Sequence, residues 1–350
     1  MEKNTKCLSF IVIAFLFFAM TEVAWSKDQY TLKYATGSRQ REGWSQFMTP
    51  YKVFIQEIET RSKGRIKVEM YAGGELGTPT QTVVQTRQGI IQMCNVEAGH
   101  FTPLYPNIQV FGIPYLFLDR HIAWHMIKGK TTQALKDAMV KTTGLRPLAF
   151  KENGGFRNFS NSKRPLRTAA DLKGLKIRTM ESPLYMQIVK DLGASPTPIP
   201  FNELYSALQL KVVDGQENAV TVFRWPKLEE VQKYMILDGH TFSFLVNLVN
   251  EKWLKSLPMD LQEAIFQADE MSVQIHTALS YLEEMKDIAE LREMGLDIYD
   301  PPLEVKDEFR RLTQKSAIEW MKNQKDIDSK YVDMILEETK QVEKELGYAR

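Results

Sequence analysis

Two arginines lie at positions where an α/β protein would need an anion to balance them. Arg178 is near the end of the run 175–180, whose alternating apolar and polar residues predict a short β-strand that feeds a helix. Arg157 lies 21 residues earlier, after the strand-like run 145–150 and a pair of glycines that is expected to form a turn. Ligands of open α/β sheets bind beyond the carboxyl ends of strands, so both guanidinium groups are predicted to converge at one edge of the sheet.

A guanidinium group offers a rigid fork of donors that fits a carboxylate bidentately, whereas a buried and unpaired charge costs several kcal/mol. Each arginine therefore needs either an acid of the same chain or an external anion. For Arg178, the internal candidates are Glu203 and Asp214, and the alternative is a ligand carboxylate. The spacing of these residues leaves both interpretations open.

A second polar cluster lies in the segment "VVDGQENAV" (212–220), where amide and acid groups interrupt an otherwise apolar region. A buried amide such as that of Asn218 must be hydrogen-bonded, and it offers both donors and an acceptor. Asn218 is therefore expected either to tie together a crossing of the chain between two lobes or to face a ligand.

Other patterns with catalytic or metal-binding potential are weak. The sequence has no nucleophile elbow, phosphate-binding loop, dinucleotide fingerprint or zinc-helix motif. Cys94 lies in an apolar run and is expected in the core, and the i, i+4 pair His121 and His125 is expected on a helix surface rather than on a metal. We therefore expect no cofactor, metal or catalytic site. The alternative is an exported α/β enzyme acting on a small acid, for which Glu97 and His100 are the candidate pair.

The N-terminal residues have the pattern of a secretory signal peptide, because Lys3 and Lys6 precede the apolar run 10–20 and small residues lead to a cleavage site after Ser26. The expected product is a soluble exported protein that retains only Cys94 and so has no intramolecular disulfide. The 350-residue chain carries a formal net charge of +1 at pH 7, which argues against nucleic acids and anionic membranes as partners.

Strand-like and helix-like runs alternate along the mature chain. This order predicts a mostly parallel sheet covered on both faces, and the length favours two lobes. From Leu261 to about Met294 the apolar residues recur at helical spacing, which predicts a helix about 45 Å long that could bridge both lobes. Two more helices are expected after residue 302. Strands are expected at 30–37, 65–71, 90–96, 145–150, 175–180 and 242–250.

Five stretches of the chain, in this order, resemble the DctP-type solute-binding proteins of tripartite ATP-independent periplasmic (TRAP) transporters. They cover about residues 30–270 and read "GRIKVEMYAGGELG", "GFRNFSNSKRPLRTAADLKGLKIRT", "LGASPTPIPFNELYSALQLKVVDGQENAV", "EVQKYMILDGH" and "NEKWLKSLPMDLQEAI". The resemblance implies a two-lobed α/β periplasmic binding protein fold, with a ligand cleft between the lobes and a long helix spanning both. The implied parts are the signal peptide, 1–26; lobe 1, 27–153 plus about 244–283; and lobe 2, 154–243 plus about 284–350.

The resemblance also implies the partners and the function. The protein is expected to be a monomer that binds a small carboxylate, closes over it and delivers it to the membrane permease subunits of a TRAP transporter. A hydroxy acid or sugar acid is favoured on family grounds alone, and the alternative is a dicarboxylate or an aromatic acid. An aromatic acid would need apolar walls, for which the candidates are Phe156, Phe201, Phe223, Trp225 and Trp44.

Six residues match the ligand contacts of the family. Arg178 in "GLKIR" matches the arginine that clamps the ligand carboxylate, and Arg157 in "GFRN" matches a second cleft arginine. The others are a cleft amide, an aromatic residue, an acid after a strand of the first lobe and a basic side chain, which match Asn218, Phe201, Glu97 and His100.

Overall fold

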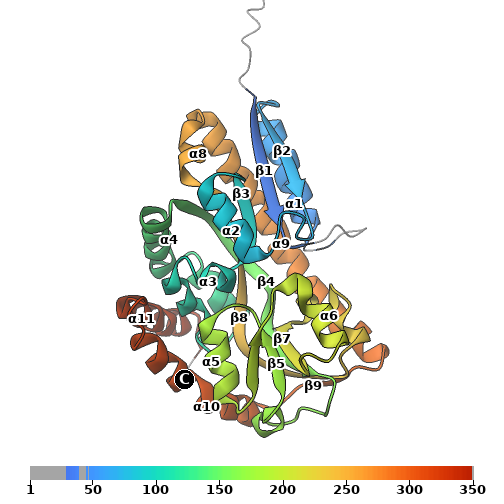
Figure 1. The fold of residues 1–350 in the computed structure, drawn as a ribbon. Coiled ribbons are helices and arrows are strands. Elements are labelled where there is room, and N and C mark those ends of the chain that lie inside the picture. The colour runs from blue at the N-terminus through green and yellow to red at the C-terminus, as the bar shows by residue number, and fades with distance from the viewer. Residues whose placement is uncertain (1–28, 39–44, 46, 349–350) are drawn as a thin grey trace, which may run out of the picture.

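The computed structural model describes residues 29–38, 45 and 47–348 (Figure 1). The predicted signal peptide, residues 1–26, and Trp44 lie outside these residues. The described residues form one nine-stranded sheet. Its strands are β1 (Tyr30–Thr36), β2 (Ile66–Tyr71), β3 (Met93–Glu97), β4 (Leu145–Asn161), β5 (Lys176–Thr179), β6 (Ser195–Pro198), β7 (Gly215–Ala219), β8 (Tyr234–Asn250) and β9 (Asp297–Tyr299).

The strands lie in the order β2-β1-β3-β8-β4-β7-β5-β6, and β9 pairs with β8. β4 and β8 are each 17 residues long and pair antiparallel along the middle of the molecule. The outer strands run parallel within each end of the sheet, β1 with β2 and β3, and β5 with β6 and β7. The prediction of a mostly parallel sheet is therefore wrong for its centre, because two long strands carry the chain in opposite directions between its ends.

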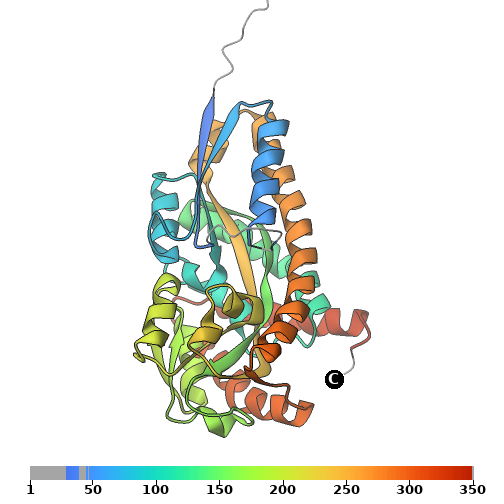
Figure 2. The same ribbon diagram turned by 90° about the vertical axis from the view of Figure 1, so that its right-hand side faces the viewer.

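Helices cover both faces of this sheet (Figure 1). The predicted long helix is confirmed as α9, which has 35 residues and is about 50 Å long at 1.5 Å per residue. Figure 2 shows it running along one side of the molecule, next to α1 at one end. The helices are α1 (Thr49–Arg61), α2 (Pro79–Gln88), α3 (Arg120–Met126), α4 (Lys130–Thr143), α5 (Pro183–Asp191), α6 (Leu204–Gln209), α7 (Val220–Arg224), α8 (Glu251–Ser256), α9 (Met259–Glu293), α10 (Leu303–Lys322) and α11 (Ser329–Glu345).

The start of α2 illustrates how local sequence fixes these elements. The Thr78 hydroxyl accepts a hydrogen bond from the backbone of Gln81, and the Gln81 side chain accepts one from the backbone of Thr78, which is a complete capping box. Pro79 occupies the first turn, where its missing N–H costs nothing, and Gly89 ends the helix in the left-handed conformation. This helix places its N-terminal turn beside the cavity described below.

The glycine pair at 154–155 does not form the expected turn. β4 continues through it to Asn161, with an irregular register between Glu152 and Phe156 where both glycines have positive φ. A Cβ on Gly154 would lie 2.1 Å from Oγ1 of Thr221, so only glycine allows the strand to bend here against its neighbours.

The expected placement of the two arginines also needs correction. Arg157 lies within β4 rather than after a strand, and β7 separates β4 from β5, which carries Arg178. The two arginines therefore do not stand at the ends of neighbouring strands. They approach one another from either side of β7.

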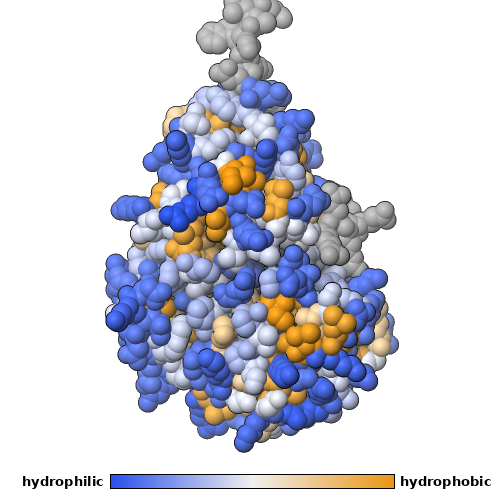
Figure 3. Space-filling model, in the orientation of Figure 1, coloured by the Kyte–Doolittle hydropathy of each residue, from blue (hydrophilic) through white to orange (hydrophobic). Residues whose placement is uncertain are grey.

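The surface shown in Figure 3 is largely hydrophilic, with apolar side chains gathered over α6. Two exposed apolar residues follow that helix, Leu210 and Val212. Among the described residues, no helix has both the length and the apolar character needed to cross a membrane.

Candidate functional site

One cavity collects all six residues that match family contacts. About 540 Å³ of space, open solvent at its mouth included, lies between the β1, β3 and α2 side of the molecule and the β5, β7 and α7 side. The six residues are Arg178, Arg157, Asn218, Phe201, Glu97 and His100. The rest of the lining is Thr36, Gly37, Ser38, Phe47, Pro79, Asn95, Val96, Asn153, Met180, Val222, Trp225 and Leu245.

Arg178 presents an unsatisfied donor in this cavity. The residue is only 1% exposed, and its Nε donates to the carbonyl oxygen of Ile199 at 2.8 Å. Its Nη2 is buried and has no hydrogen-bond partner among the described residues. Burial lowers the pKa of Arg178 to about 10, an effect that the carboxylate of Glu217 partly offsets. A buried cation with a free donor at a cavity wall creates a site for an anion.

Neither acid considered as an internal partner of Arg178 forms an ion pair with it in the described part of the chain. Asp214 lies 3.5 Å from the ammonium of Lys163 and accepts a hydrogen bond from the backbone of Lys176. Glu203 is exposed. The structure therefore leaves the positive charge of Arg178 facing the cavity.

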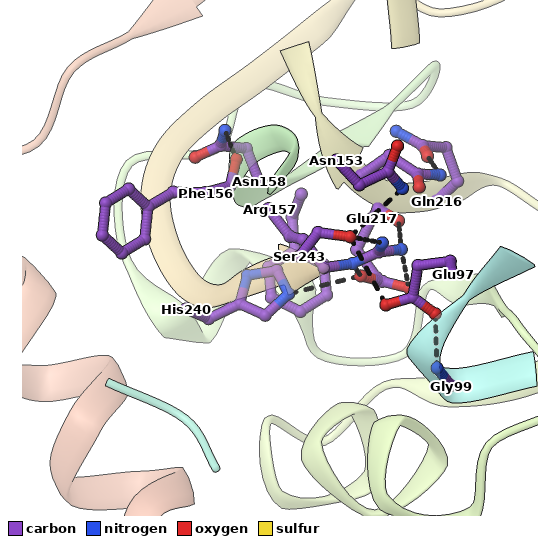
Figure 4. A network of polar contacts seen from close by, with 12 residues as sticks. Glu97, Gly99, Asn153, Phe156, Arg157, Asn158, Gln216, Glu217, His240 and Ser243 are labelled. Atoms are coloured by element: carbon purple, nitrogen blue, oxygen red, sulfur yellow. Dashed lines mark hydrogen bonds and ion pairs between the residues drawn. The ribbon is translucent and has the colours of Figure 1, made fainter. Parts of the chain in front are cut away.

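Arg157 is satisfied within the protein, as Figure 4 shows. Its Nε lies 2.5 Å from Oε2 of Glu217, and its Nη2 donates to Oε1 and to the backbone oxygen of Glu217 at 2.9 and 2.7 Å. Its Nη1 donates to the hydroxyl of Ser243 at 3.2 Å. Glu217 was not among the predicted site residues. The signal that could have pointed to it is the acid in "DGQEN", next to the predicted Asn218.

His240 completes this buried cluster, and the sequence interpretation gave it no role. Its ring lies 2.7 Å from Asp238 and 3.4 Å from Glu217, and it stacks on Phe159. Burial alone would lower the pKa of His240, but the charge of Asp238 and the hydrogen bonds to both carboxylates raise it to about 9. The Arg157 cluster, comprising Arg157, His240, Glu217 and Asp238, thus contains two cations and two anions.

Glu97 and His100 lie at the end of β3 and in the 3-10 turn that follows it. Glu97 Oε2 accepts a hydrogen bond from the backbone of Gly99 at 2.6 Å, and Oε1 accepts one from Ser243 at 3.4 Å (Figure 4). Burial raises the pKa of Glu97 to about 7. Burial and the nearby arginines lower the pKa of His100 to about 3, so its imidazole is neutral, and its buried Nδ1 has no partner in the described structure.

Amide and aromatic groups complete the walls. Nδ2 of Asn218 donates to Oε1 of Gln216 at 2.5 Å, which fixes the amide beside the cavity. At the mouth, the ring of Trp225 lies 5.3 Å from that of Phe47 and is stacked on Phe201 at 5.7 Å. Phe201 also lies 5.8 Å from the guanidinium carbon of Arg178, a cation–π contact.

Two of the aromatic residues that were candidates for an apolar wall do not line the cavity. Phe156 packs against Phe242 at 5.0 Å, and Phe223 is fully buried in an apolar cluster. Trp225 and Phe201 do line it, and Phe47 is an aromatic wall that the sequence interpretation missed. The hydroxyl of Thr80 on α2 donates to Glu181 after β5 at 2.9 Å, a contact between the two sides of the cavity.

The weak candidates are placed elsewhere. Cys94 is buried, and burial raises the pKa of its thiol to about 12, which leaves it uncharged. His121 is paired with Asp119 on the surface. The part of the chain that the structure describes contains no group of three or more His, Cys, Asp or Glu side chains placed to hold a metal ion.

Comparison with known proteins gives consistent results. Residues 42–324 match the model of the family described as DctP, bacterial extracellular solute-binding protein, family 7. An uncharacterized protein of Haemophilus influenzae is 35% identical over 71% of this chain and 75% of its own length. The 2,3-diketo-L-gulonate-binding periplasmic protein of Escherichia coli is 33% identical over 71% of this chain and 75% of its own.

Solved structures extend the similarity to the whole fold. The sugar acid binding protein of Advenella mimigardefordensis, in complex with galactonate, matches with a TM-score of 0.85 and 27% identity over 90% of this chain and 99% of its own. A TRAP periplasmic solute-binding protein of Polaromonas, bound to D-erythronate, has a TM-score of 0.81 and 28% identity over 88% and 98%. With its two-lobed α/β fold, this chain belongs to the DctP family, the solute-binding proteins of TRAP transporters.

Proposed function

We propose that this protein binds a small hydroxylated carboxylic acid, a hydroxy acid or a sugar acid, in the cavity at Arg178 and delivers it to the permease of a TRAP transporter. The observation that carries the proposal is the buried guanidinium of Arg178, whose Nη2 has no partner among the described residues and whose side chain lines the cavity. Three similar proteins support this ligand class, since their names state galactonate, D-erythronate and 2,3-diketo-L-gulonate as ligands.

The cavity supplies groups for both ends of such a ligand. The carboxylate would accept hydrogen bonds from Arg178, and exclusion of water would strengthen this charge-assisted pair. Asn218, Glu97 and His100 would exchange hydrogen bonds with the hydroxyl groups, since each brings a buried polar group to the wall. Phe201, stacked between Arg178 and Trp225, would hold the guanidinium in its orientation.

The movement that admits the ligand follows from the chain path. We propose that lobe 1 comprises residues 27–153 and about 244–283, and that lobe 2 comprises 154–243 and about 284–350. The first boundary is at the glycine pair 154–155, where the register of β4 is irregular and the strand carries no side chains. The lobes would separate in the free protein and close on the ligand, because a ligand shifts the equilibrium only if it binds the closed form more tightly.

The remaining parts of the proposal follow from family membership and the N-terminal sequence. Residues 1–26 direct export to the periplasm and are then removed. The mature protein acts as a monomer, needs no cofactor, and releases its ligand chemically unchanged. Arg157 contributes indirectly, through the Ser243 hydroxyl that it shares with Glu97.

The test is binding by the mature protein, starting at residue 27, after bound ligand has been removed by unfolding and refolding. A panel of aldonates, uronates, hydroxy acids, dicarboxylates, aromatic acids and neutral sugars is screened by thermal shift, and hits are measured by calorimetry. We expect a hydroxylated acid to bind, and Arg178→Ala to weaken it at least tenfold, from loss of about 1.5–3 kcal/mol. Arg178→Lys retains the charge without the fork and should also weaken binding.

A matched control is Arg167→Ala, which removes a half-exposed arginine that pairs with Asp297 away from the cavity. It should leave the affinity unchanged. Binding of neutral sugars alone, or an Arg178→Ala variant with unchanged affinity for the acid, would contradict the proposal. Recovery of a chemically altered acid would instead indicate an enzyme.

A further inference from the structure

We infer that the cavity selects acids that carry a single negative charge, and that Glu97 takes up a proton when such an acid binds above neutral pH. The inference rests on the proposed function and specifies the ligand class and its pH dependence. It follows from the charges that surround the cavity and from the way in which each is paired.

The first step is the Arg157 cluster. Its two cations, Arg157 and His240, face its two anions, Glu217 and Asp238, at distances between 2.5 and 3.4 Å. All four side chains are buried, so water does not screen their charges. The cluster is therefore balanced within the protein and has no net positive charge to offer a ligand.

The second step is the set of groups that face Glu97. Arg157 on β4 and Glu217 on β7 belong to the balanced cluster. Tyr185 on α5 and His100 are neutral, because burial raises the pKa of the tyrosine and lowers that of the histidine. Arg178 on β5 is then the cation lining the cavity whose charge no ion pair within the described residues balances.

Lys151 on β4 is a further buried cation, and it does not line the cavity. The ammonium of Lys151 lies 5.0 Å from the centroid of the Tyr51 ring and has no hydrogen-bond partner among the described residues. Burial lowers the pKa of Lys151 to about 8, and the carboxylate of Asp269 opposes this effect. Neither Lys151 nor Asp269 lines the cavity, so Lys151 offers no direct contact to a ligand bound there.

Binding of an acid changes this balance. A ligand carboxylate at Arg178 neutralises the unpaired cation, and an ionised Glu97 is then left as an excess negative charge in a site closed to water. The pKa of Glu97 is already raised to about 7 by burial, and the added negative charge raises it further. Glu97 therefore binds a proton as the ligand enters, and its carboxyl group can then donate a hydrogen bond to a ligand hydroxyl.

The same balance rejects a second carboxylate on the ligand. That group would be buried without a cation, and burial of an unpaired charge is strongly unfavourable. An aldarate differs from its aldonate only in having a second carboxylate in place of the terminal alcohol. We expect the aldarate to bind at least thirtyfold more weakly than its aldonate, which is about 2 kcal/mol.

The direction of the pH dependence is fixed by linkage. Below pH 7 Glu97 is protonated in both the free and the bound protein, and the affinity is constant. Above pH 7 the free protein loses this proton whereas the complex keeps it, so the dissociation constant rises by up to tenfold per pH unit. The corresponding uptake at pH 8 is expected to exceed about half a proton per ligand.

The experiment uses aldonates of four to six carbons, among them D-erythronate and galactonate, with the aldarate of each. Calorimetry at pH 8 in phosphate and in Tris, which differ in ionisation enthalpy, gives the number of protons taken up. Glu97→Gln mimics the protonated carboxyl, so it should abolish proton uptake and give a flat affinity from pH 6.5 to 9. Glu181→Gln is the control: this carboxylate accepts a hydrogen bond from Thr80 outside the cavity lining, and its loss should leave proton uptake unchanged.

The outcomes separate this inference from the proposed function. If an aldonate binds but its aldarate binds within threefold as tightly, or if no proton is taken up at pH 8, the inference is wrong and the function as an acid-binding protein stands. The proton measurement on the unmodified protein decides this even if Glu97→Gln fails to fold. If no acid of the panel binds to the unmodified protein, the proposed function fails and this inference fails with it.

Discussion

The pairing of Arg157 with Glu217 makes a prediction that separates a structural arginine from a ligand-binding one. Sequence resemblance assigned Arg157 to the ligand, whereas the structure shows its Nε and Nη2 occupied by Glu217. The perturbation is a double-mutant cycle of Arg157→Met and Glu217→Met, two apolar replacements of similar length. Each single variant leaves one buried charge of the pair uncompensated, and the double variant removes both.

The expected magnitudes follow from this burial. Arg157 and Glu217 are 0% and 1% exposed, so each single variant should lose about 3–5 kcal/mol of unfolding free energy. Glu217→Met should be the worse of the two, because His240 loses a partner as well. The double variant should be close to the unmodified protein, since an apolar pair of similar volume can replace a buried ion pair at little cost. With about 2.1 cal/mol/K per residue over roughly 320 residues, each single variant should melt about 4–7 °C lower.

The assay is thermal and urea unfolding of ligand-free protein, with acid affinity measured separately. The result expected is two destabilised single variants and a double variant that recovers most of the loss, a coupling of several kcal/mol. If Arg157→Met cost less than about 1 kcal/mol and instead weakened the acid as much as Arg178→Ala, the pair would not be the main role of Arg157. Arg157 would then be a direct ligand contact.

Two further predictions concern Gly99 and His240. A Cβ on Gly99 would lie 2.2 Å from Sδ of Met180 and 2.8 Å from Oε2 of Glu97, so Gly99→Ala should hold the two sides of the cavity apart. Calorimetry should then show at least threefold weaker acid binding, and an unchanged affinity would contradict this prediction. The pKa of His240 is raised to about 9, so its stabilising contribution is complete below its unfolded-state value of about 6.5 and is lost as the pH rises through 9. Urea midpoints should therefore fall between pH 6.5 and 9, and His240→Gln should flatten that fall; an equal fall in the variant would assign the pH dependence to another group.

Local sequence signals were enough to predict helices and strands that depend on residues close together in the chain. The apolar repeat from Leu261 to about Met294 predicted α9, and the alternation at 175–180 predicted a strand that feeds a helix, which the structure has as β5 and α5. The course of β4 through Gly154 was not predictable in this way. A glycine pair in a sequence is typical of a turn. Here the strand continues, and glycine is required because Thr221, 67 residues further along the chain, lies too close for a side chain.

The candidate site was predictable to a different extent. Resemblance placed six residues in one cavity, but it did not reveal how the charges are paired, because pairing depends on strand register. Glu217 and His240 belong to the cluster whose positive and negative charges cancel, and no local sequence pattern marks either residue. Phe47 was missed for a similar reason, since it meets Trp225 from a distant part of the chain.

The register of β7 explains why two arginines of one cavity have different roles. In the β4–β7 pair Arg157 lies opposite Ala219, two residues from Glu217, so Arg157 and Glu217 are diagonal neighbours on one face. In the β5–β7 pair Arg178 lies opposite Gln216. β7 therefore supplies a carboxylate to Arg157, whereas the Gln216 side chain opposite Arg178 is hydrogen-bonded to Ser160 and Asn218 and gives Arg178 no negative charge. Exchanging residues 216 and 217 would keep the composition of the segment, yet it would move the acid to the other face. The unpaired cation that a ligand requires is thus set by a single position in a five-residue strand.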